Sequence, residues 1–264
     1  METSHPGIGI ERHGEHVAEL VLDRPAAMNA VSTQQAESIT TATDSLAGDR
    51  SVRVVIVTSS SPKAFCVGAD LKERNDFTDA DLLAQRPIAR RAYRGVLDLP
   101  VPTVAVVAGY ALGGGFEIAL SCDLIVAEEQ AVFALPEVSV GLVPGGGGTQ
   151  LLTRRIGWSR AADLVLTCRR VGASEGERLG FVDRRVATGA GRKEALALAD
   201  TIAGHSPVGV RNAKSAMRLG LDVDLASGLE VEDGAWRATA FSPDRVEGIA
   251  AFNEKRTPRW PGSD

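Results

Sequence analysis

Two apolar, β-branched segments of this chain each lead, within a few residues, to a glycine-bearing turn and the start of a helical pattern. Val52–Thr58 leads to Phe65–Leu71, and Thr103–Ala108 leads to Gly113–Ile118. Continuous apolar strands of this kind are usually covered on both faces, as in α/β proteins. The repeated order of strand, turn and helix therefore predicts an α/β core.

The segments around these two units fit the same class. Val17–Leu22 and Leu124–Ala127 are predicted strands. A helix is expected from about Ser32 to Leu46, because Ser32 and Gln35 have capping-box spacing. Lys72–Leu99 is charged and helix-forming, and we expect helices and mobile loops over a cleft there, interrupted at Pro87.

From about Arg154 onward the pattern is mainly helical. Ser206-Pro207 and Ser242-Pro243 each have an N-cap residue followed by proline at the first helical position. We therefore expect an α/β core over residues 1–200 and a helical C-terminal region over 201–264. The predicted C-terminal helices are 192–204, 207–219, 224–240 and 243–254.

Charge and composition exclude several classes of protein. The formal net charge of -5 argues against a protein that coats nucleic acid, which needs a broad positive surface. The three cysteines are far apart in sequence, which is neither a disulfide framework nor a zinc site. No segment has the ~20 apolar residues of a membrane span, and the N-terminus has no signal-peptide core, so a cytoplasmic location is expected. The four histidines lie away from the glycine-rich turns in sequence, so the chemistry falls to carboxylates and backbone groups.

Two glutamates lie beside glycine-rich turns. Gly113-Gly-Gly-Phe-Glu117 opens a helical pattern directly after a buried strand. Free N–H groups at a helix N-terminus favour a developing oxyanion, and Glu117 adds a titratable group beside them. Glu137 follows Pro136, and the turn Gly145–Gly148 comes shortly after. That turn is either a tight connection or a phosphate-binding loop.

The order of these motifs resembles the enoyl-CoA hydratase/isomerase (crotonase) superfamily, and the resemblance covers nearly the whole chain. The matching segments are Asp23-Arg-Pro25, Asn29-Ala30, Lys63-Ala-Phe-Cys-Val-Gly-Ala-Asp70, Gly109-Tyr-Ala-Leu-Gly-Gly-Gly-Phe-Glu117, Cys122-Asp123, Pro136-Glu137, Gly147-Gly-Thr-Gln150 and Phe252-Asn-Glu-Lys-Arg-Thr-Pro-Arg259.

The resemblance implies a spiral core of repeated ββα units with a helical C-terminal trimerisation region. It also implies that the backbone N–H groups of Ala69 and Gly114 form an oxyanion hole for a thioester carbonyl. Family members with glutamates at the positions of Glu117 and Glu137 are typically hydratases. The implied reaction is syn addition of water to a trans-2-enoyl-CoA.

Coenzyme A is then part of the substrate, and the resemblance implies no cofactor and no metal. It implies a homotrimer or a dimer of trimers, with Lys255 acting across a subunit boundary. Many relatives have lysine where this chain has Ala26. Lys72 is a further candidate for a phosphate contact, although a solvated surface charge explains each cation equally well. The implied CoA-binding residues are Arg24, Lys63, Ala64, Val67, Gly68, Asp70, Leu71 and Lys255.

The sequence also fits other functions. An enoyl-CoA isomerase generally needs one carboxylate near Glu137, so two glutamates favour hydration. Pro144–Gln150 and Leu99–Thr103 are similar to the methylglutaconyl-CoA hydratase branch. From another class, Arg90–Arg94 is a short basic cluster with an aromatic residue that suggests RNA binding, although a solvated helix face explains it better. A CoA-binding protein without catalysis is the last alternative.

Overall fold

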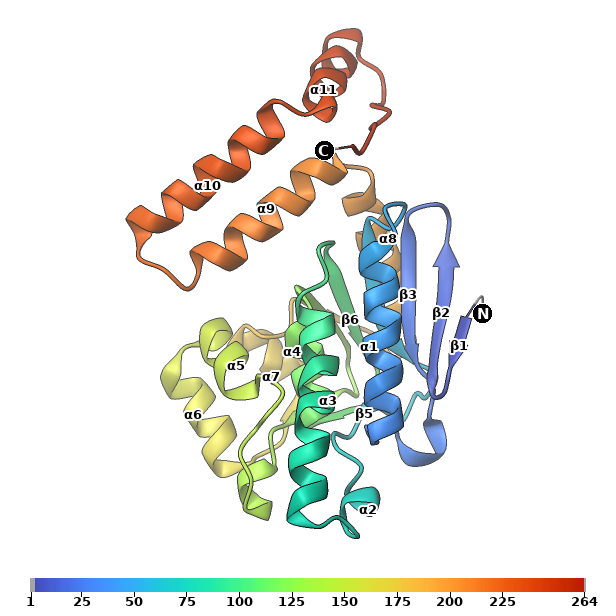
Figure 1. The fold of residues 1–264 in the computed structure, drawn as a ribbon, viewed down its shortest axis with the longest axis vertical. Helices are drawn as coiled ribbons and strands as arrows, with labels where there is room; N and C mark the ends of the chain where they lie inside the picture. The colour runs from blue at the N-terminus through green and yellow to red at the C-terminus, as the bar shows by residue number, and fades with distance from the viewer. Residues whose placement is uncertain (1–2, 264) are drawn as a thin grey trace.

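The computed structural model describes residues 3–263, whose strands form two sheets (Figure 1). The larger sheet has seven strands in the order β1-β2-β3-β4-β6-β8-β11, and the smaller has four in the order β10-β9-β7-β5. The strands of the larger sheet are β1 (Thr3–His5), β2 (Ile8–His13), β3 (Val17–Leu22), β4 (Val54–Ser59), β6 (Thr103–Val107), β8 (Leu124–Glu128) and β11 (Arg184–Val186). Those of the smaller sheet are β5 (Ala64–Cys66), β7 (Tyr110–Leu112), β9 (Val132–Ala134) and β10 (Val171–Gly172).

Three pairs of consecutive strands are divided between the two sheets: β4 and β5, β6 and β7, and β8 and β9. β4, β6 and β8 are parallel neighbours in the larger sheet, and β5, β7 and β9 are parallel neighbours in the smaller one. Helical segments follow each pair, so the chain advances one ββα unit at a time, and the expected spiral core is confirmed. These segments are α2 (Leu71–Arg74) and α3 (Asp79–Leu97), then α4 (Gly114–Ser121), then the 3-10 helix η2 (Glu137–Val140) and α5 (Gly148–Ile156).

The buried strands do not alternate apolar with polar residues, and strand β4 shows the reason. Val54 and Ile56 face a cluster that includes residues of α8 (Gly191–Ala203), whereas Val55 and Val57 belong to the main core. Successive side chains of a strand point to opposite faces, so a sheet covered on both sides requires apolar residues at every position.

The predicted N-cap of the first long helix is confirmed. Helix α1 (Thr33–Gly48) has Ser32 as its N-cap, and the Ser32 hydroxyl accepts a hydrogen bond from the Gln35 N–H at 3.2 Å. The Gln35 side chain does not return to Ser32 to complete the box. It donates instead to the Gly7 carbonyl, which ties α1 to the turn before β2.

The expected interruption at Pro87 is wrong, because α3 continues through this residue. The helix is fixed at its start by a reciprocal capping box between Thr78 and Asp81. Proline leaves the carbonyl four residues earlier without its helical donor. That residue is Leu83, which is 76% exposed, so the missing bond falls on a solvent-facing part of α3.

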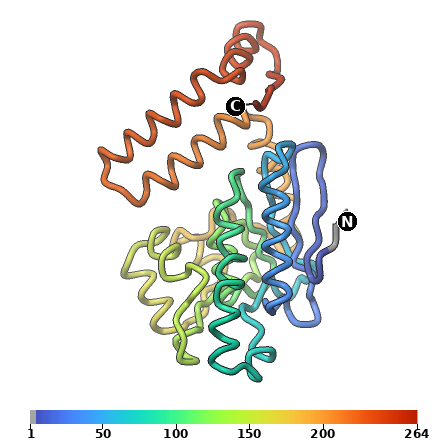
Figure 2. Tube along the Cα trace, viewed as in Figure 1, coloured from blue at the N-terminus to red at the C-terminus, as the bar shows by residue number. Residues whose placement is uncertain are grey.

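The C-terminal helices form an arm that projects from the sheets (Figures 1 and 2). Ser206 and Ser242 cap the first and last of its helices, as predicted. Lys214 ties the arm to the core, because its ammonium group donates to the Val101 carbonyl and pairs with Asp123, both at 2.7 Å. The arm consists of α9 (Pro207–Gly220), α10 (Leu225–Ala240) and α11 (Pro243–Glu254).

The proposed boundary between residues 200 and 201 stays a prediction. The remaining helices are η1 (Pro25–Ala27), α6 (Trp158–Thr167) and α7 (Ala173–Leu179).

Candidate active site

Glu117 lies in the first turn of α4 and is 2% exposed. Gly113, the N-cap, has a φ of 52°, which favours glycine. A side chain on Gly115 would collide with the Cys66 carbonyl, so the start of α4 packs directly against β5. Phe116 packs with Phe133 and Phe181, with ring centroids 5.1 Å from each, and this cluster fixes the buried side of α4.

Two backbone N–H groups hold the Glu117 carboxylate. Oε1 accepts hydrogen bonds from Gly146 and from Gly148, each at 2.7 Å. Burial raises the pKa of Glu117, and these N–H donors oppose that rise by stabilising the ionised form. The glycine run was interpreted above as a connection or a phosphate loop. Its contact with Glu117 gives it a different role that the sequence did not reveal.

Glu137 is the first residue of η2, and its carboxyl group approaches the start of α4. A Cβ atom on Gly113 would lie 2.8 Å from Glu137 Oε1. Among the described residues, the buried Oε2 atom has no hydrogen-bond partner. Burial raises the pKa of Glu137 to about 7, and the Glu117 charge adds to the rise. The two carboxyl groups thus lie near one helix end in different settings. Burial raises the pKa of both, but the Glu117 carboxylate accepts two backbone N–H bonds, whereas Glu137 Oε2 has no partner in the part of the chain that the structure describes.

The loop that carries Ala69 meets the start of α4 through backbone atoms, because a Cβ on Gly68 would lie 3.0 Å from the Gly114 nitrogen. Val31 N–H donates to the Gly68 carbonyl at 2.7 Å, and Asp70 N–H donates to the Val31 carbonyl at 3.0 Å. In such a bridge the intervening Ala69 N–H points away from Val31. Within residues 3–263 neither this N–H nor that of Gly114 has a backbone acceptor.

Tyr93 was not identified as a site residue from the sequence. This residue of α3 is 8% exposed, and a Cβ on Gly114 would collide with its hydroxyl group. Its ring lies against Gly146, where an added Cβ would lie 2.8 Å from Cγ. Burial and the charge of Glu117 raise the Tyr93 pKa, so the phenol stays protonated. Because the side chain is buried in the site, it is not available to stack on an RNA base.

The comparisons with known proteins agree on one family. The family model for enoyl-CoA hydratase/isomerase matches residues 12–263. The chain belongs to the enoyl-CoA hydratase/isomerase family.

Its relatives within the family carry several names. The human mitochondrial enoyl-CoA hydratase domain-containing protein 2 is 40% identical over 250 residues, which are 93% of this chain and 86% of that protein. The mouse mitochondrial methylglutaconyl-CoA hydratase is 37% identical over 257 residues, 96% of this chain and 82% of that protein. A crystal structure of an enoyl-CoA hydratase from Bacillus anthracis has a TM-score of 0.95 and 37% identity, and covers 97% of this chain and 100% of that one.

The crotonase resemblance also implied CoA-binding residues, which the structure places in different settings. Arg24 and Asp70 bond to each other at 2.9 Å, and Asp70 also caps α2. Lys63 and Leu71 are exposed, whereas Ala64 and Gly68 are buried and Val67 is half-buried. Lys255 is exposed at the end of α11, in the distal arm far from α2 and β5 (Figure 1).

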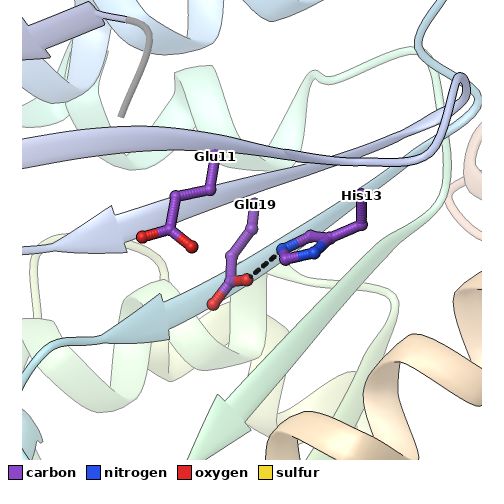
Figure 3. Close-up of side chains that lie close together, drawn as sticks. All are labelled: Glu11, His13 and Glu19. Atoms are coloured by element: carbon purple, nitrogen blue, oxygen red, sulfur yellow. Dashed lines mark hydrogen bonds and ion pairs between the residues drawn. The ribbon is translucent and has the colours of Figure 1, made fainter.

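One side-chain cluster outside the enoyl-CoA hydratase/isomerase motifs has the composition of a metal site. Glu11, His13 and Glu19 bring their polar atoms within 4.8 Å of one another on β2 and β3 (Figure 3). The buried Glu19 is already engaged: Oε1 accepts from Thr58 and Oε2 accepts from Arg192, which also pairs with Glu11. We therefore interpret the cluster as an ion network that links the sheet to α8.

Across residues 3–263, no helix is both long and apolar enough to cross a bilayer.

Proposed function

We propose that this chain hydrates a trans-2-enoyl-CoA, with Glu117 as general base and Glu137 as general acid. The observation that supports the proposal best is the pairing of two carboxyl groups in different environments at one helix end. Glu117 accepts two N–H bonds, whereas Glu137 has a buried oxygen without a partner. Different hydrogen-bond environments of this kind are how active sites divide the roles of base and acid between two carboxyl groups.

In the proposed reaction, the Glu117 carboxylate takes a proton from water while the water oxygen forms a bond to Cβ of the enoyl group. The electrons of the double bond move toward the thioester carbonyl, whose oxygen gains negative charge. The backbone N–H groups of Ala69 and Gly114 stabilise that charge. Glu137 then donates its proton to Cα on the same face, which gives the 3-hydroxyacyl thioester by syn addition. Proton exchange with solvent restores both carboxyl groups, and the proposal needs no cofactor or metal.

The first test is the loss of the enoyl ultraviolet absorbance of crotonyl-CoA. A positioned acid or base contributes ~10²–10⁴-fold, so Glu117→Gln and Glu137→Gln should each lower turnover by about that factor. Glu37→Gln, at an exposed position of α1, is the matched control and should hydrate at the wild-type rate. Near-wild-type turnover in either site variant would remove that residue from the mechanism.

A branched, carboxyl-bearing substrate is the second candidate. A relative named methylglutaconyl-CoA hydratase is 37% identical to this chain. Two arginines of α2 and α3 lie near the proposed reacting centre. The charge of Arg74 lowers the pKa of Tyr93, and the charge of Arg86 lowers the pKa of Glu117. A panel of short, long and methylglutaconyl thioesters, compared by kcat/KM, decides among these acyl groups. The appearance of a 2-enoyl product from a 3-enoyl-CoA without water addition would favour the isomerase alternative instead.

We also propose that the arm carries the contacts of a homotrimer or a dimer of trimers in the cytoplasm. Its helices and the turns between them expose large apolar side chains, a surface that usually marks an association site. Leu225, Trp236, Phe241 and Phe252 are 79%, 65%, 84% and 84% exposed. Light scattering on the purified chain should give three or six times the monomer mass, and a monomer would contradict the assembly. Cell fractionation tests the location.

A further inference from the structure

A chain of short contacts runs from α3 to the Glu117 carboxylate. Arg86 Nη2 donates a hydrogen bond to the Gly145 carbonyl at 2.8 Å. The next residue, Gly146, donates its N–H to Glu117 Oε1, and Gly148 donates to the same oxygen. Any movement of Gly145 therefore changes the position of the donors that hold Glu117.

A second contact from the same helix supports this turn. Tyr93 is seven residues after Arg86, which places it on the same face of α3 two turns later. Its ring packs against Gly146, as described above. Helix α3 thus contacts two consecutive glycines of the turn, one through a hydrogen bond and one through ring packing.

The charge of Arg86 also reaches Glu117. It lowers the Glu117 pKa and so opposes the effect of burial, as the two N–H donors do. The other titratable groups that face this region are Glu137 from η2 and Tyr93 from α3, and Cys66 from β5 faces Tyr93. None of these three adds positive charge, so Arg86 is the cation that acts on the carboxylate from the elements described around it.

The arginines of α5, which packs against α4, are engaged elsewhere. Arg154 pairs with Asp222, and Arg155 pairs with Asp183 and donates to the Cys122 carbonyl. Arg74 donates to the Gln85 side chain, and its charge lowers the pKa of Tyr93.

We propose that Arg86 is a positioning residue for Glu117, whose carboxylate it orients through the Gly145–Gly148 turn. This inference rests on the proposed hydration, in which Glu117 is the base. Arg86 does not itself touch the reacting atoms in this account.

The test compares three variants across a pH series with crotonyl-CoA. Arg86→Gln removes the charge, Arg86→Lys keeps it, and Arg90→Gln removes an equal charge one turn later on the exposed surface of α3. We expect Arg86→Gln to lower kcat by about tenfold to a hundredfold, the effect of a small misplacement of a catalytic group. KM should change little, and the acid limb of the kcat profile should move to higher pH. Arg86→Lys should return the acid limb toward the wild-type position, and Arg90→Gln should match the wild type.

A measurement without substrate separates this inference from the proposed function. The carboxyl ¹³C signal of Glu117, assigned by its loss in Glu117→Gln, should titrate at higher pH in Arg86→Gln than in the wild type. This readout holds whether or not the wild type hydrates the thioesters tested. Unchanged titration and an unchanged pH profile in a folded Arg86→Gln protein would overturn the proposal. So would an effect confined to KM for methylglutaconyl-CoA, because that result would assign Arg86 to the acyl tail.

Discussion

Gly68 lies directly against Gly114, so the two loops of the proposed oxyanion hole meet through their backbones. A Cβ on Gly68 would lie 3.0 Å from the Gly114 nitrogen and 2.9 Å from the Leu112 carbonyl oxygen. Gly68 also has a φ of 91°, a conformation that other residues rarely adopt. Two requirements, space and backbone conformation, therefore fix glycine at this position.

Gly68→Ala should separate these loops and lower the hydration rate. Loss of one oxyanion donor typically costs ~10²–10³ in rate, and we expect a decrease of that order in kcat for crotonyl-CoA. Gly180→Ala is the matched control, because Gly180 has a φ of 96° with nothing near its Cβ position. It carries the backbone strain without the clash and should keep wild-type activity. Equal activity in the two variants would contradict the proposed role of the loop contact.

The pH dependence of hydration should have an alkaline limb set by Glu137. The acid must be protonated to donate to Cα, and its pKa is raised to about 7 by burial and then by Glu117. We therefore expect kcat/KM to fall as the pH rises above about 7. A full pH series in the wild type and in Glu137→Gln measures this. If the alkaline limb lies at the same pH in both proteins, a group other than Glu137 sets it.

Glu137 should also reduce stability at neutral and alkaline pH. Its folded pKa of about 7 lies above the ordinary glutamate value of 4.5, so the folded protein binds more protons than the unfolded chain between these values. The free energy of unfolding should therefore fall as the pH rises from about 4.5 to about 7 and then level off. Glu137→Gln removes this penalty. Its Tm should exceed that of the wild type at pH 8 and match it at pH 4, whereas an equal Tm at pH 8 would mean that burial does not disfavour the charged form.

The ion pair between Lys214 and Asp123 should stabilise the attachment of the arm. Breaking a buried pair by removing one partner costs ~3–5 kcal/mol, and the contacts of Asp123 with Arg218 and Thr103 place Lys214→Met toward the lower value. Urea unfolding measures the loss, and hydrogen exchange should rise first in α9. Lys193→Met, on the exposed face of α8, should change neither. Equal stability of the two variants would show that the arm is held by its other contacts.

Local features of the fold could be predicted from the sequence, because their causes lie within a few residues. Apolar runs gave strands β3, β4, β6 and β8, and serine followed by proline marked the starts of α9 and α11. The interruption expected at Pro87 was wrong, since the capping box at Thr78 and the buried face of α3 outweigh one missing N–H. The family resemblance covered the chain and is confirmed by the family model.

The interactions within the site depend on distant residues and could not be predicted in this way. Gly146 and Gly148 are 29 and 31 positions from Glu117, and no local pattern shows that their N–H groups meet its carboxylate. Tyr93 and Arg86 belong to a segment that was interpreted as helices and mobile loops. Only the tertiary fold, which places α3 beside the glycine turn, brings them to Glu117.

The most direct test of the two-carboxylate account is hydration of crotonyl-CoA in D₂O, with the product analysed by NMR. The account predicts one deuterium at Cα, delivered on the same face as the new hydroxyl group at Cβ, and loss of this product in both Glu117→Gln and Glu137→Gln. Deuterium at Cα on the opposite face, or no addition of water by the wild-type protein, would contradict it.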